Sequence, residues 1–230
     1  MRPDIEPNYH NIVQLLEQGF SGDATHTIDH VFRVYNNALK IARGENGVDL
    51  HVLKLAVLLH DIARGREDAD NTGRSDHATM GAEMAAKILE ELKYEKGIVE
   101  RVAHCIAAHR YRSGLKPETI EAQILYEADK IDLLGAIGVA RSFMIAGEQG
   151  QQLYSRTNLD DYIRDNSVDG KPDGRIKEIS RHTANIEYEI KIKNIPSKIK
   201  TETGKKIAEE RLGIMADFFA RLRQEIEGCA

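Results

Sequence analysis

The sequence lacks the features that mark secreted and membrane proteins. Only two cysteines, Cys105 and Cys229, occur in 230 residues, so no disulfide framework is expected and a reducing compartment is favoured. No apolar run approaches the roughly 20 residues that cross a bilayer, and the first residues lack the charged-then-apolar pattern of a signal peptide. We therefore expect a cytoplasmic protein with no membrane partner.

Positive charge is also scarce. The 32 Lys and Arg residues are outnumbered by 37 Asp and Glu residues, which gives a formal net charge of −5. Such a chain has no general electrostatic attraction for a nucleic acid polymer or an anionic membrane. A phosphate-bearing substrate would have to be captured by local positive charge and a metal ion. A small molecule fits this composition better than a nucleic acid polymer does.

Strand patterns and nucleophile motifs are rare as well. No Gly-rich phosphate loop is present, and neither cysteine has a base nearby in sequence to activate it. Apolar residues instead recur at helical spacing through the first two thirds of the chain, which predicts an all-α fold. Breaks are expected at 19–23, 44–47, 64–75 and 113–117, where glycine, proline and polar residues collect. A long amphipathic helix around Leu212 to Leu222 is predicted to pack on the bundle or to form a homodimer face.

His60 and Asp61 directly follow a run of apolar residues, from Leu53 to Leu59, that predicts a buried helix. A carboxylate is costly to bury unless a positive group meets it, and a divalent metal ion would do so. His30 on an earlier helix and Asp129 on a later one complete a set of two imidazoles and two carboxylates. A lone histidine on an apolar face is usually a core residue, but this combination favours a metal site.

These residues resemble the HD superfamily of metal-dependent phosphohydrolases. The similarity includes H-x-x-R-V from His30 to Val34, the doublet itself, the segment that begins at Asp76-His77, and the segment from Ala128 to Ala136. The similarity to the small stand-alone members of the superfamily continues through 201–225. The resemblance implies a single HD-type domain over 1–230, a compact helical bundle with a metal site between helices, with 149–230 as a C-terminal extension packed on the helical core. It also favours a helix over 186–192, where alternating apolar residues would equally fit a strand.

The resemblance implies the metal ligands. They are His30, His60, Asp61 and Asp129, and this mixture of donors suits Mn, Fe, Co, Ni or Zn better than Ca, with Mg as a further option. His26 lies one turn before His30 and could chelate a metal with it. We assign His30 alone as the ligand and place His26 at the rim of the pocket as a substrate-binding residue.

Asp61, His77 and His109 are the candidate catalytic residues. His109 continues the inward face of Val102 and Ile106, whereas His104 points about 140° away from it on a helix. In two-metal branches of the superfamily, extra histidines come from comparable helices. His77 and His109 are therefore expected either to contact phosphate and act in acid catalysis, or to hold a second ion.

Three cations are candidates for binding substrate phosphates: Arg64, Arg66 and Lys130. Arg64 and Arg66 lie in the polar stretch 64–76, which could close over a substrate or be a simple connector. Glu67-Asp68 resembles the acidic pair of alarmone hydrolases, but the pair lies further from the doublet and the match is discounted.

The expected activity is metal-dependent hydrolysis of a phosphoester or phosphoanhydride in a small nucleotide-like substrate. A divalent ion would activate water for in-line attack on phosphorus. A cyclic-nucleotide or alarmone phosphodiesterase is the alternative enzyme. A non-catalytic HD module that senses a nucleotide is the alternative from another class.

Overall fold

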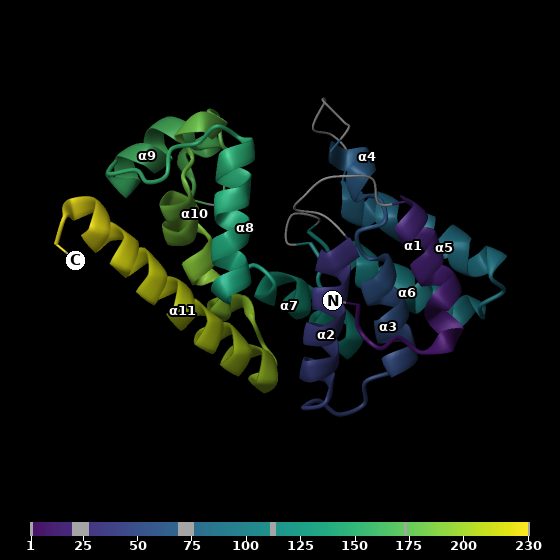
Figure 1. Cartoon of the computed structure of the whole chain (residues 1–230). Helices are drawn as coiled ribbons and strands as arrows, with labels where there is room; N and C mark the ends of the chain where they lie inside the picture. Colours follow the sequence, from purple (N-terminus) through teal and green to yellow (C-terminus); the bar gives the residue numbers. More distant parts are fainter. Residues whose placement is uncertain (1, 20–27, 69–75, 111–113, 173, 230) are drawn as a thin grey trace. The chain divides into compact units, whose positions relative to one another are not determined.

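Figure 1 shows the computed structural model, which describes residues 2–19, 28–68, 76–110, 114–172 and 174–229. Helices and turns make up the described residues; they contain no β-strand, although an isolated bridge pairs Ser167 with Ile176. The predicted all-α fold is confirmed. The chain divides into two compact units, Met1–Lys130 with Thr201–Gly204 and Ile131–Lys200 with Lys205–Ala230. None of the described helices has the length and apolar character that a membrane crossing needs.

The first unit is a bundle of helices in which α3 packs on both α2 and α6, and α6 packs on α5 (Figure 1). The helices of this unit, which follow the short turn η1 (Pro7–Tyr9), are α1 (His10–Gly19), α2 (Ile28–Ala42), α3 (Leu50–Leu59), α4 (Arg64–Asp68), α5 (His77–Glu91), α6 (Lys96–Ala108) and α7 (Ile120–Ile131).

Helix α3 is the most completely buried helix of this bundle. Its apolar side chains from Val52 to Leu59 are all inaccessible to solvent, and burying each large one contributes roughly 1.5–3 kcal/mol. Asp49 caps the start of the helix by accepting hydrogen bonds from the backbone N–H groups of His51 and Val52. The helix therefore delivers His60 and Asp61, which follow it, to the inside of the unit.

Helix α4 occupies part of the stretch that polar composition predicts to be a loop. Its first turn continues from the doublet, because the backbone N–H of Arg64 donates to the carbonyl of Asp61. Glu67 is hydrogen-bonded to the side chains of His77 on α5 and of Arg110 after α6, and these tertiary contacts stabilise a helical turn that local sequence does not indicate. Residues 69–75 lie outside the described residues, so closure of this stretch over a substrate stays a prediction.

Buried Glu127 ties residue 201 to the first unit. The carboxylate on α7 accepts hydrogen bonds from the Thr201 backbone N–H at 3.1 Å and from Gln123 Nε2 at 2.7 Å. It also accepts a hydrogen bond from the Thr201 hydroxyl. Because a buried carboxylate must be hydrogen-bonded, these contacts explain why Thr201–Gly204 belong to the first unit.

The second unit contains the predicted C-terminal helices. Residues 186–190 lie in α10, as the resemblance implied, and the long terminal helix is α11, which is yellow in Figure 1. The elements are α8 (Gly135–Glu148), α9 (Leu159–Asn166), η3 (Val168–Gly170), η4 (Ile179–Arg181), α10 (Ala184–Ile190), η5 (Ile192–Asn194), η6 (Pro196–Lys198) and α11 (Glu202–Glu227), which belongs to this unit from Lys205 onwards.

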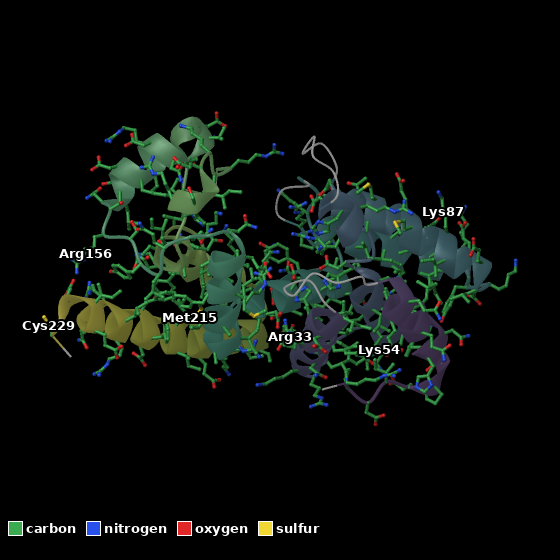
Figure 2. All side chains as sticks on the ribbon, turned by 45° about the horizontal axis from the view of Figure 1, so that its top comes forward. Arg33, Lys54, Lys87, Arg156, Met215 and Cys229 are labelled. Carbon is green, nitrogen blue, oxygen red and sulfur yellow. The ribbon has the colours of Figure 1, made fainter. Side chains whose placement is uncertain are left out.

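One face of α11 covers α8 and α10. Met215, labelled in Figure 2, is fully buried in this unit, and its sulfur lies 3.1 Å from where a Cβ at Gly138 would be. Phe219 stacks on Tyr188 with 4.7 Å between ring centroids and on Phe143 with 6.3 Å. The amphipathic helix thus buries its apolar face within this unit. Packing of 149–230 on the helical core stays a prediction, as does the homodimer.

Candidate metal centre

Asp61 lies between two pairs of histidines contributed by different helices of the first unit. Its Oδ2 is 3.6 Å from Nε2 of His30, and its Oδ1 is 3.4 Å from Nε2 of His77. The Asp61 side chain is only 7% exposed. One carboxylate therefore presents a different oxygen to each side of a buried cluster.

His30, His60 and Asp61 form the first trio of potential ligands, with their ligand atoms all within 4.8 Å of one another. His60 Nδ1 donates a hydrogen bond to the Val57 carbonyl at 2.8 Å, so Nε2 carries the free lone pair. That buried Nε2 has no hydrogen-bond partner among the described residues. Leaving such an atom unsatisfied costs roughly 1–3 kcal/mol, and a metal ion would satisfy it.

Asp129 adds a second carboxylate beside this trio. Asp129 lies on α7, and its Oδ1 is 3.3 Å from Nε2 of His30. Its Oδ2 accepts a hydrogen bond from Lys130 Nζ at 2.7 Å. The sequence-predicted ligands His30, His60, Asp61 and Asp129 are thus brought together from α2, the end of α3 and α7.

Asp61, His77 and His109 form a second trio, again with ligand atoms within 4.8 Å of one another. His109 Nδ1 donates to the Ile106 carbonyl at 2.5 Å, and His77 Nδ1 donates to Glu67 Oε2 at 2.5 Å. Both Nε2 atoms therefore carry lone pairs, and they face each other at 3.2 Å. Two acceptors at this distance repel unless a cation lies near both, so this trio also fits a metal ion.

Glu67 and Arg110 form an ion-pair network behind His77. Glu67 accepts hydrogen bonds from His77 and from Arg110 Nη1, and Arg110 also reaches Asp76 Oδ1 at 3.1 Å. Asp76 occupies the N-cap position of α5, but it makes no capping hydrogen bond, because its oxygens bond Arg110 and Thr79. Glu67 orients His77 in the way that carboxylates orient metal-binding histidines.

The electrostatics of the cluster favour metal binding near neutral pH. Burial raises the pKa of Asp61, but the neighbouring imidazoles of His60 and His30 lower it further, so the carboxyl ionises well below its ordinary range. Burial lowers the pKa of His109 to about 3 and also lowers the pKa of His77. Ionised carboxylates and neutral imidazoles are the protonation states in which these groups bind metal.

Gly81 allows α5 to approach the doublet closely. A Cβ at this position would lie 3.3 Å from the His60 carbonyl oxygen and 3.4 Å from a methyl carbon of Ile106. The absence of a side chain therefore helps to bring the N-terminal end of α5, with His77, next to His60.

The three candidate phosphate-binding cations lie in different surroundings. Arg64 is half-buried, with Nη1 3.4 Å from His77 Nδ1 and 3.5 Å from a Glu67 oxygen, so it lies beside the second trio. Arg66 is exposed on α4. Lys130 forms its ion pair with Asp129, beside the first trio.

The structure separates His109 from His104, the two histidines that the sequence analysis compares. His109 is 1% exposed and belongs to the cluster. His104, on the same helix, accepts a hydrogen bond from the Glu118 backbone N–H at 3.2 Å and is not part of either trio. His26 lies outside the described residues, so its place at the pocket rim stays a prediction.

The family comparison agrees with this geometry. Residues 27–134 match the HD domain family, so this part of the chain is an HD domain. YpgQ of Bacillus subtilis is 26% identical over 207 residues, which cover 88% of this chain and 85% of YpgQ. Ribonuclease Y of Chloroflexus aurantiacus is 34% identical over 87 residues, which cover 38% of this chain but only 14% of that enzyme.

Solved structures share the fold over nearly the whole chain. The crystal structure of YpgQ in complex with ADP has a TM-score of 0.69 at 26% identity and covers 96% of this chain and 95% of YpgQ. An HD-superfamily hydrolase from Bacillus thuringiensis also has a TM-score of 0.69, at 25% identity. The match covers 96% of this chain and 97% of the hydrolase chain. The likeness to HD-superfamily hydrolases supports hydrolase activity as the general class of function.

Proposed function

We propose that this protein is a metal-dependent phosphohydrolase that cleaves a phosphoester or phosphoanhydride bond in a small nucleotide-like substrate. The observation that carries the proposal is buried Asp61, which presents one oxygen to His30 and the other to His77. The buried Nε2 of His60, which has no hydrogen-bond partner in the described part of the chain, supports it. A structural core would not retain an unpaired acceptor beside two ionised carboxylates.

The donor set indicates which residues hold metal. His30, His60, Asp61 and Asp129 would hold one divalent ion, and imidazole with carboxylate suits Mn, Fe, Co, Ni or Zn. His77 and His109 would hold a second ion with the other oxygen of Asp61. The two facing Nε2 lone pairs favour this ligand role over acid catalysis by either histidine. A bound divalent ion lowers the pKa of water and withdraws charge from a phosphoryl oxygen.

Phosphate groups of the substrate would be bound by cations of the chain itself. Arg64 lies beside the second trio and can donate two parallel hydrogen bonds to a phosphate. Exposed Arg66 follows it on α4, and Lys130 lies beside the first trio. These local charges would compensate for the net charge of −5 and capture a few phosphates.

The nucleotide part of the proposal is supported by similarity. YpgQ, which shares the fold and about a quarter of its residues with this chain, was crystallised with ADP. The acidic composition argues for a small substrate over a nucleic acid polymer. We therefore propose nucleoside phosphates as the first substrates to test.

The test is a panel of nucleoside mono-, di- and triphosphates and cyclic nucleotides, assayed with Mn, Fe, Co, Ni, Zn and Mg beside RNA and DNA oligonucleotides. The proposal expects metal-dependent turnover of at least one small nucleotide. Faster cleavage of oligonucleotides would favour a nuclease instead. Nucleotide binding with no turnover under any metal would favour a non-catalytic sensor.

Asp61→Asn provides the matched test of the site, because it keeps the volume of the side chain and removes its charge. Asp217→Asn is its control, since Asp217 is exposed on α11. Turnover should disappear in Asp61→Asn and persist in Asp217→Asn. Equal turnover in both variants would show that the activity does not come from this cluster.

A further inference from the structure

The second unit contains a cavity of about 330 Å³ between α8, α10 and the segments on either side of α10. Its volume is at the lower end of the roughly 300–1,000 Å³ typical of small-molecule sites. Branched aliphatic side chains form much of its wall: Ile145, Ile176, Ile179 and Ile192. None of the cluster ligands lines it, so it is a separate feature of the molecule.

A fixed carboxylate forms one wall of this cavity. Glu187 Oε2 accepts a hydrogen bond from His182 Nε2 at 2.7 Å and lies 3.0 Å from Lys191 Nζ. His182 Nδ1 in turn accepts from the Tyr162 hydroxyl at 2.6 Å, and that hydroxyl accepts from Asn166 Nδ2 at 3.0 Å. Tyr162 is 1% exposed, so the whole chain of hydrogen bonds is anchored in the interior of the unit.

The second oxygen of Glu187 is available to a ligand. Both contacts of the carboxylate are made by Oε2, and Oε1 accepts no hydrogen bond from the described residues. Burial raises the pKa of Glu187, but its bonds to His182 and Lys191 lower it further, so the group stays ionised at neutral pH. The cavity therefore combines aliphatic walls with an anionic acceptor, and the cations Arg141 and Lys191 also line it.

We infer that this cavity binds the base of a nucleoside-like molecule, with the ring between the aliphatic side chains and an N–H of its edge donated to Glu187 Oε1. A nucleobase has apolar faces and an edge of hydrogen-bonding groups, and proteins hold single bases between apolar side chains in this way. Gln149, Gln151 and Thr183 line the same cavity and supply further polar groups for the edge. This inference goes beyond the proposed function, because the cavity needs neither metal nor phosphate.

The test is equilibrium binding of adenosine, guanosine, cytidine and uridine to the full chain in the presence of a chelator. Nucleosides carry no phosphate, and the chelator removes any contribution of a metal ion. At least one nucleoside should bind, and ribose should not. Absence of binding by all four nucleosides, or equal binding of ribose, would overturn the inference.

Two variants address the cavity itself. Ser142→Leu places a larger side chain on its wall, and among the described residues the Ser142 hydroxyl bonds only the Gly138 carbonyl of its own helix. Glu187→Gln keeps the size of the side chain and removes the anionic acceptor. Each should weaken nucleoside binding by about tenfold or more, the factor expected for a blocked site or a lost hydrogen bond to a charged group.

The control is Met144→Leu, because Met144 lies on the same helix, is 46% exposed and does not line the cavity. It should bind nucleoside like the wild type. Circular dichroism and thermal unfolding establish that each variant is folded. Wild-type affinity in a folded Ser142→Leu or a folded Glu187→Gln would place the binding elsewhere and overturn the inference.

Discussion

Replacing Glu67 with Gln should weaken the binding of the second ion, which we propose that His77 and His109 hold, by about 10- to 100-fold. The Glu67 carboxylate accepts a hydrogen bond from His77 Nδ1 at 2.5 Å, and its side chain is only 18% exposed. A hydrogen bond to a charged group is worth roughly 1.5–3 kcal/mol, and each 1.4 kcal/mol is a factor of ten. Loss of comparable supporting bonds to metal ligands usually costs about 10- to 100-fold.

A titration with Co²⁺, followed by visible absorbance, measures the affinity of each of the two trios for the ion and does not depend on turnover. The control is Glu83→Gln, because Glu83 is exposed on the same helix as His77. Glu67→Gln should retain the ion at His30 and His60 and bind the other one weakly, with a parallel fall in kcat/KM. An unchanged Co²⁺ titration in a folded Glu67→Gln variant would refute the idea that this carboxylate orients His77.

Three further predictions concern the cluster. Asp61→Asn should bind neither ion tightly and lose nearly all activity, since the variant lacks the charge shared by both trios; elemental analysis and the nucleotide assay measure this. His109→Ala should reduce activity far more than His104→Ala, because only His109 lies in the cluster; equal losses would contradict this. In the metal-free protein, buried His109 should contribute a loss of about 1.4 kcal/mol of stability per pH unit as the pH falls from about 6.5 towards about 3, because the unfolded chain takes up a proton that His109 does not bind in the folded state. Urea unfolding from pH 7 to pH 5 tests the slope, which should flatten in His109→Gln.

The helices, the place of the His60-Asp61 doublet and the inward position of His109 could be predicted from sequence, because the spacing of apolar residues carries this information. The apolar run of α3 ends at His60, so a polar doublet had to lie at the end of a buried helix. The spacing of Val102 and Ile106 likewise placed His109, and not His104, on the inner face of α6. These arguments depend only on the period of a helix.

The network behind His77 could not be predicted because its members meet only in three dimensions. The distance of Glu67 from the doublet in sequence argues against the match to the acidic pair of alarmone hydrolases, yet α4 brings its carboxylate onto His77. Arg110, 43 residues further on, carries no motif of its own. An acidic residue in the turn after the doublet was the available signal, and its partner became apparent only from the fold.

The sequence does not indicate the cavity of the second unit for a similar reason. Its walls come from α8 and from α10 and its flanking turns, and the aliphatic residues are widely spaced along a stretch poor in hydrophobic residues. Glu187 and His182 follow no recognised motif. Only the packing of these elements brings a carboxylate and four isoleucines around one space.

The central claim is that this cluster of histidines and aspartates is a metal site that performs phosphate ester hydrolysis. Elemental analysis of the purified protein, with nucleotide turnover measured on the same sample before and after chelation, tests it most directly. We predict at least one divalent transition-metal ion per chain, loss of turnover when it is removed, and recovery when it is restored. Metal-free protein that retains full turnover in the presence of chelator would contradict the account.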